Sequence, residues 1–95
     1  MAALHLMISG RVQGVGFRWS MCDAALEHGA RGWVRNRRDG RVEAVVEGDE
    51  ASVAAMLRWS RHGPRSARVD DVESRPATAS ETALVGSGFE PLADA

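Results

Sequence analysis

Lysine is absent from this 95-residue chain, and cysteine and histidine are scarce. Without lysine the sequence cannot form the Walker phosphate loop, which ends in Gly-Lys-Ser/Thr. Cys22 is alone, which excludes an internal disulfide and favours a reducing compartment. His5, His28 and His62 are scattered rather than set at metal-ligand spacing, so we expect no metal and no other cofactor.

Long hydrophobic runs are also missing. No apolar stretch approaches the roughly 20 residues that span a bilayer, and the N-terminus lacks the charged start and cleavage site of a signal peptide. We therefore expect a cytoplasmic protein without a membrane partner. The length allows one domain over residues 1–95, and we expect it to be a monomer.

Charge is unevenly distributed along the chain, although the formal net charge is only −1. Residues 11–41 contain seven arginines and three acidic residues, a balance of +4, whereas residues 42–95 contain five arginines and ten acidic residues. The basic region could steer a small anion. Alternatively, Arg35, Arg37 and Arg38 could simply solvate a hairpin.

A glycine-bearing turn precedes Arg18 at the expected start of a helix. Gly10, Gly14 and Gly16 can adopt positive φ, so that successive backbone N–H groups converge on one anion. The helix dipole and the planar guanidinium of Arg18 would add to phosphate binding. The dinucleotide pattern G-x-G-x-x-G fails because Trp19 occupies the third glycine position. A plain strand-to-helix turn is the alternative.

Hydrophobic periodicity predicts the order strand, helix, strand, strand, helix, strand. The expected elements are a strand at 4–8, a helix at 17–28 that ends at Gly29, strands at 30–36 and 42–47, a helix capped by Asp49, and a strand at 67–74. Val42, Ala44 and Val46 should face inward, with Arg41, Glu43 and Glu47 outward. Asp39-Gly40 predicts a two-residue type I′ hairpin turn. In the expected strand at 67–74, Val69 and Val72 have opposite parity in the inward and outward alternation, so a bulge can lie between them.

This order of elements predicts an α+β fold, a ferredoxin-like βαββαβ sandwich with a mostly antiparallel sheet and two helices on one face. The small, polar composition of residues 76–88 predicts a loop, followed by a short edge strand near Phe89. Because Pro91 cannot donate to a strand ladder, we expect residues 91–95 to be a frayed tail.

Two segments together resemble the acylphosphatase family. The first follows Gly-x-Val-Gln-Gly-Val-x-Phe-Arg over residues 10–18, and the second follows Gly-Trp-Val-x-Asn-x-x-Asp-Gly over residues 32–40. Weaker similarity extends the resemblance to roughly residues 4–75. Acylphosphatases have the ferredoxin-like architecture, and the final strand near Phe89 is where this sequence departs from the family.

The resemblance implies hydrolysis of the carboxyl-phosphate bond of a small-molecule acyl phosphate. It implies that Arg18 binds the phosphate and that Asn36 positions the attacking water. The phosphate-binding residues would be the turn that precedes Arg18, namely Gln13, Gly14, Val15, Gly16 and Phe17. No metal ligand is implied.

Three other functions compete with this one. RNA-recognition modules share the order of elements but use aromatic residues on the central strands, and residues 4–8 and 42–46 contain none, so we expect no nucleic-acid partner. A domain that handles carbamoyl phosphate, as found within hydrogenase-maturation proteins, and an anion-binding regulatory module without turnover stay open.

Overall fold

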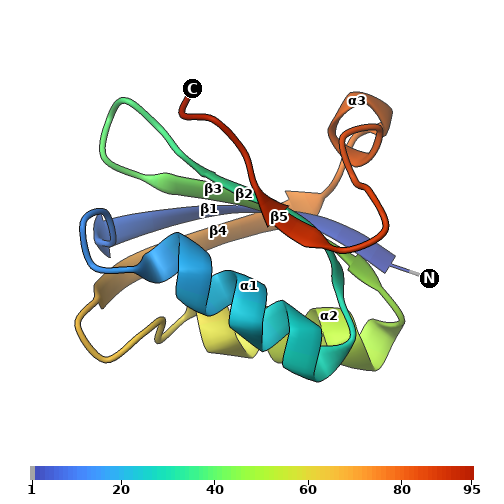
Figure 1. The fold of residues 1–95 in the computed structure, drawn as a ribbon, viewed down its shortest axis with the longest axis horizontal. Helices are drawn as coiled ribbons and strands as arrows, with labels where there is room; N and C mark the ends of the chain where they lie inside the picture. Colours follow the sequence, from blue (N-terminus) through green and yellow to red (C-terminus); the bar gives the residue numbers. More distant parts are fainter. Residues whose placement is uncertain (1) are drawn as a thin grey trace.

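A five-stranded sheet in the order β4-β1-β3-β2-β5 forms the frame of the computed structural model, which describes residues 2–95 (Figure 1). The elements are β1 (Ala2–Arg11), α1 (Phe17–His28), β2 (Arg31–Asn36), β3 (Val42–Gly48), α2 (Glu50–Ser60), β4 (Arg68–Pro76), α3 (Ala79–Thr82) and β5 (Phe89–Pro91). β1 pairs antiparallel with β3 and β4, β2 pairs antiparallel with β3, and β5 is parallel to β2. Helices α1 and α2 cover one face of the sheet. The ferredoxin-like α+β fold is confirmed.

The core lies between this face and the two helices. Val42, Ala44 and Val46 of β3 are fully buried there, as their alternation predicts. The helices contribute Met21 and Ala25 from α1 and Val53 and Met56 from α2. Among the helices of residues 2–95, none has the length and apolar character needed to cross a bilayer.

The helix ends are where the sequence predicts them. Gly29 ends α1 in the left-handed conformation, at φ 72°, which a residue with a Cβ adopts poorly. Asp49 caps α2, because its Oδ1 accepts a hydrogen bond of 2.7 Å from the backbone N–H of Ser52.

The predicted bulge lies in β4, opposite the end of β1. The register between β1 and β4 shifts between Ser9 and Gly10, so that Asp71 faces Ser9 while Val69 faces Gly10. Gly10 has φ 128°, and a Cβ at this position would overlap the carbonyl oxygen of Arg68. The close approach of β4 therefore requires glycine here, and the extra residue of the bulge is Asp70 on β4.

The hairpin between β2 and β3 differs from the predicted type I′ turn. Gly40 has a positive φ but Asp39 does not. Arg37 accepts a hydrogen bond from the Gly40 N–H at 3.2 Å and donates one to Arg41 at 2.8 Å, which gives a three-residue loop closed by a left-handed glycine. Asp39 instead accepts hydrogen bonds from the backbone and guanidinium of Arg41, and these hold the pKa of Asp39 below its ordinary value.

The C-terminal third corrects two predictions. Residues 76–88 are not all loop, because Thr78 and Glu81 form a reciprocal capping box that starts the short helix α3. Residues 91–95 are not frayed either. The Leu92 N–H bonds to Val34 at 2.8 Å, the Ala95 N–H bonds to Asn36 at 3.0 Å, and β5 is thereby prolonged along β2 despite Pro91. We refer to residues 92–95 as the tail.

Helix α3 lies on the sheet face opposite α1 and α2 (Figure 1). Trp33, 1% exposed, donates its indole N–H to the Glu81 carbonyl at 3.0 Å. Glu43 points away from α1 and α2 as predicted, but it is buried, 6% exposed, rather than in solvent. It hydrogen-bonds His5 at 2.7 Å and Arg35 at 2.7 Å. The expected solvent-facing surface of the sheet is therefore partly a second, polar layer.

Candidate active site

The turn between β1 and α1, which we call the glycine loop (residues 12–16), has the conformation that its glycines predict. Gly14 has φ 73° and Gly16 has φ 77°, and Gly16 is the N-cap of α1 without a side-chain cap. Val12 is buried, 1% exposed, and anchors the loop in the core. The buried Val12 at one end and the left-handed glycines at the other turn the backbone sharply before α1.

The backbone N–H groups of residues 14–19 are not used as donors within the described fold. Among the hydrogen bonds of residues 2–95, none uses one of these six N–H groups as donor, and the first helical bond runs from Ser20 to Gly16 at 3.0 Å. Three of the six are the unpaired N–H groups of the first turn of α1. A run of free donors at a helix N-terminus is suited to bind an anion.

Two side-chain contacts tie the glycine loop to other parts of the fold, one from Gln13 within the loop and one from Ser66 outside it. The Gln13 amide donates to the carbonyl oxygens of Arg37 at 2.7 Å and Arg41 at 2.9 Å. The Ser66 hydroxyl donates to the Val15 carbonyl at 2.9 Å. Gln13 therefore fixes the loop against the β2–β3 hairpin, which follows directly after Asn36.

Arg18 projects from the first turn of α1, and its side chain is 35% exposed. Its Nη1 lies 3.4 Å from Oδ1 of Asp94 in the tail. This separation is longer than the roughly 2.7–2.9 Å of a strong charge-assisted bond, and the Asp94 side chain is 65% exposed. The contact is a weak one that a phosphate could displace.

Asn36 is the last residue of β2 and is partly exposed. Its side chain makes no hydrogen bond within residues 2–95, while its backbone carbonyl accepts the bond from Ala95. Asp94 contacts Arg18 and the next residue bonds to Asn36, so the tail bridges the two predicted catalytic residues. The glycine loop, the hairpin and the end of the tail lie at the same end of the molecule (Figure 1).

The predicted phosphate-binding residues differ in their contacts. Gly14, Val15 and Gly16 present backbone N–H groups. The Gln13 amide is already engaged with the hairpin carbonyls. Phe17 is buried, 2% exposed, with its ring centroid 5.3 Å from that of Trp59, so its ring belongs to the core and not to the turn.

Sequence reasoning missed Ser66 and Asp94 as neighbours of the site, because both lie outside the two motifs. It also left open whether Arg35, Arg37 and Arg38 serve an anion or solvate the hairpin. Arg35 and Arg37 both reach Glu43 on the opposite face, at 2.7 and 3.3 Å. Those two arginines are therefore occupied away from the glycine loop.

A second group of titratable residues lies on that opposite face. Donor atoms of His5, Glu43 and Glu81 lie within 4.8 Å of one another, a grouping that sequence spacing could not reveal. Arg35 binds Glu43, and Arg75 binds both carboxylate oxygens of Glu81 at 2.8 and 2.7 Å. Because guanidinium groups already neutralise both carboxylates, this set is better suited to an ion-pair network than to a metal.

The network also sets the ionisation of its acids. Burial alone would raise the pKa of Glu43, but hydrogen bonds from His5 and Arg35 outweigh burial and the pKa is lowered. Arg75, with the Thr78 N–H, lowers the pKa of Glu81 to about 2. Both carboxylates are therefore charged at neutral pH, and the pairing of Glu81 with Arg75 of β4 holds α3 on the sheet.

Comparison with known proteins identifies the family. The acylphosphatase family model matches residues 4–91. An acylphosphatase of Thiobacillus denitrificans is 51% identical over 94 residues, which is 99% of this chain and 100% of that protein. One from Pyrobaculum arsenaticum is 58% identical over 79% of this chain and 80% of its own length. The crystal structure of acylphosphatase from Bacillus subtilis superposes with a TM-score of 0.86, 32% identity and coverage of 97% and 99% of the two chains. The chain therefore belongs to the acylphosphatase family and is a hydrolase of that family.

Proposed function

We propose that the chain hydrolyses the carboxyl-phosphate bond of acyl phosphates, with the phosphoryl group held by Arg18 and by the N–H groups of residues 14–19, and with the water held by Asn36. The observation that carries the proposal is the run of six unused N–H groups beside Arg18. Gln13 and the tail join this run to the strand end that carries Asn36.

The chemistry needs charge stabilisation more than acid or base catalysis. A carboxylate is a weakly basic leaving group, so it departs without a general acid. A loose phosphoryl transition state gathers negative charge on its equatorial oxygens, and fixed N–H dipoles and the Arg18 fork stabilise that charge without reorganising. The proposed reaction forms a P–O bond to water, breaks the bond between phosphorus and the carboxylate oxygen, and releases inorganic phosphate.

Asn36 would act on the water rather than on the phosphate. Its side-chain carbonyl can accept a hydrogen bond from the water and direct an oxygen lone pair at phosphorus. The water proton would pass to a phosphate oxygen of the substrate. His5 and His28 lie away from this site: His5 is buried against Glu43 on the opposite face, and His28 ends α1, roughly 16 Å along the helix from its start. His62 lies just beyond α2 and belongs to neither motif.

An anion-binding module without turnover would use the same N–H groups and Arg18. Phosphate release distinguishes the two functions. Purified protein should release inorganic phosphate from acetyl phosphate above the uncatalysed rate, in excess EDTA as well as without it. Arg18→Ala should abolish the release, whereas Arg58→Ala, an exposed arginine at the end of α2, should not change it. Binding of phosphate without hydrolysis, or strict dependence on added Mg²⁺ or Zn²⁺, would contradict the proposal.

A further inference from the structure

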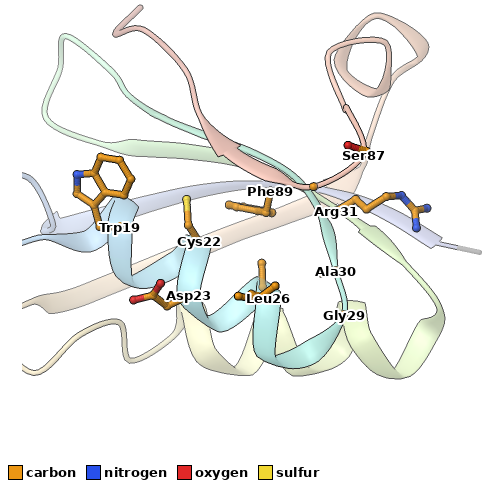
Figure 2. Close-up of a pocket in the computed structure, with 11 residues that line it drawn as sticks. Trp19, Cys22, Asp23, Leu26, Gly29, Ala30, Arg31, Ser87 and Phe89 are labelled. Atoms are coloured by element: carbon orange, nitrogen blue, oxygen red, sulfur yellow. The ribbon is translucent and has the colours of Figure 1, made fainter.

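A groove of about 520 Å³ runs between α1 and the β5 edge of the sheet (Figure 2). Its walls include Trp19, Cys22 and Leu26 from α1 and Phe89 from β5. In Figure 2 the Cys22 sulfur and the Leu26 side chain point from α1 toward Phe89. The volume lies within the roughly 300–1,000 Å³ of small-molecule sites. We call this feature the α1–β5 groove.

Apolar side chains at the groove are left in solvent. Trp19 is 67% exposed and Leu26 is 84% exposed. Within residues 2–95 the other large hydrophobic side chain with such exposure is Leu84, at 52%, which does not line the groove. A ligand that removes this apolar surface from water would gain affinity in proportion to the area that it covers.

The groove begins beside the proposed phosphate site. Residues three or four apart share one face of a helix, so Arg18, Cys22 and Leu26 form one row along α1. At about 1.5 Å per residue, Cys22 lies about 6 Å and Leu26 about 12 Å beyond Arg18 along the helix axis. The wall formed by β5 also leads to Arg18, because the chain continues from Phe89 to Asp94, and Asp94 contacts Arg18.

Charge at the groove disfavours acidic ligands. Burial, with Asp23 and Glu90 nearby, raises the pKa of the Cys22 thiol, which therefore stays neutral and lines the wall as a small apolar group. Asp23 also belongs to the lining. The one basic side chain of the lining, Arg31, is bound to Glu47 at 2.9 Å.

We infer that the α1–β5 groove binds the acyl part of the substrate and selects extended, uncharged acyl groups. The inference rests on the proposed function, since a phosphoryl group beside Arg18 would direct its acyl substituent into the groove. An acetyl group is too short to reach Leu26, whereas a hexanoyl chain extends along the row. Hexanoyl phosphate should therefore be a better substrate than acetyl phosphate by about 10- to 100-fold in kcat/KM.

The test compares two exposed leucines by steady-state hydrolysis of both substrates. Leu26→Glu should remove most of the preference for hexanoyl phosphate and leave kcat/KM for acetyl phosphate within about twofold. The matched control Leu84→Glu adds the same charge at a leucine outside the groove and should retain the full preference. Succinyl phosphate, which ends in a carboxylate, should be a poorer substrate than hexanoyl phosphate in the unmodified protein.

Other outcomes would overturn the inference in distinguishable ways. Equal kcat/KM for acetyl and hexanoyl phosphate, or an equal loss of preference in both leucine variants, would refute a selective groove while hydrolysis of acetyl phosphate still supports the proposed function. A failure to hydrolyse either substrate would refute the proposed function and the inference with it. Circular dichroism of each variant checks that the fold is retained.

Discussion

Gln13 ties the glycine loop to the hairpin after Asn36, so its replacement should lower stability and activity together. The side chain makes two hydrogen bonds, of 2.7 Å to Arg37 and 2.9 Å to Arg41, in a partly buried position. Gln13→Met keeps the length of the side chain and removes both donors. At about 0.5–1.5 kcal/mol for each bond, the free energy of unfolding should fall by roughly 1–3 kcal/mol.

The same change should also loosen the placement of Asn36 relative to the phosphate. Misplacing reacting groups by about 1 Å can cost on the order of 100-fold in rate, so we expect kcat for acetyl phosphate to fall by about 10- to 100-fold. Inhibition by inorganic phosphate should weaken less, because Gly14, Gly16 and Arg18 are unchanged. Urea unfolding gives the loss of stability, and phosphate release gives the loss of kcat.

Ser66→Ala is the matched control for Gln13→Met. It removes the other brace of the loop, a single exposed hydrogen bond to the Val15 carbonyl, and should cost less than about 1 kcal/mol with little loss of kcat. If Gln13→Met retains both the urea midpoint and kcat of the unmodified protein, the loop is not held by this side chain. The proposed link between the loop and the hairpin would then be wrong.

The opposite face and the sheet give three further predictions. Glu43→Gln should lower the free energy of unfolding, measured in urea, by about 2–3 kcal/mol, which is below the full cost of breaking a buried pair because its arginine partners can still reach water. Turnover of acetyl phosphate should be unchanged, and a loss of turnover would show that this face takes part in the reaction. Because Arg75 lowers the pKa of Glu81 from an ordinary 4.5 to about 2 in the folded state, the unfolded state binds more protons between these values, so stability should decrease as pH falls from about 5 to 2. Glu81→Gln should flatten that decrease in urea midpoints, and an unchanged slope would refute the role of the carboxylate. Gly32→Ala should cost about 3 kcal/mol or more, because its φ of 150° and the carbonyl of Val45 leave no room for a Cβ; a thermal midpoint near that of the unmodified protein would contradict this.

Much of the fold could be predicted from local patterns. Apolar alternation through Val42, Ala44 and Val46 identified the core face of β3, and Gly29 and Asp49 marked helix ends, because each of these signals depends on a few neighbouring residues. The position of the hairpin was predicted correctly, but its turn type was wrong. Asp39 has a negative φ and accepts hydrogen bonds from Arg41, and these contacts cannot be seen in the Asp-Gly pair alone.

Features that depend on distant partners were missed. The tail is ordered by bonds to Val34 and Asn36, more than fifty residues away, so the local effect of Pro91 was a poor guide. The burial of Glu43 depends on His5, Arg35 and the arrival of α3 over the sheet. One local signal was available for α3, since Thr78-x-x-Glu81 is a capping box in sequence.

The motif residues were found by resemblance, and the structure adds the contacts that their side chains make. The glycine loop and Arg18 were predicted as the phosphate site, and the free N–H groups fit that prediction. Sequence alone could not show that the Gln13 amide is engaged with the hairpin or that Phe17 is in the core. Both are side-chain contacts across the fold rather than features of the turn.

The most direct measurement of the central claim is the inhibition constant of inorganic phosphate in Asn36→Ala, with Arg18→Lys as the reference variant. Arg18→Lys keeps the charge and loses the bidentate fork, so phosphate inhibition and kcat/KM should both weaken, the latter by about 100-fold or more. Asn36→Ala should lower kcat by about 100-fold and leave phosphate inhibition near that of the unmodified protein. Loss of phosphate inhibition in a folded Asn36→Ala protein would instead make Asn36 a phosphate ligand or a support of the loop, and would contradict its assignment to the water.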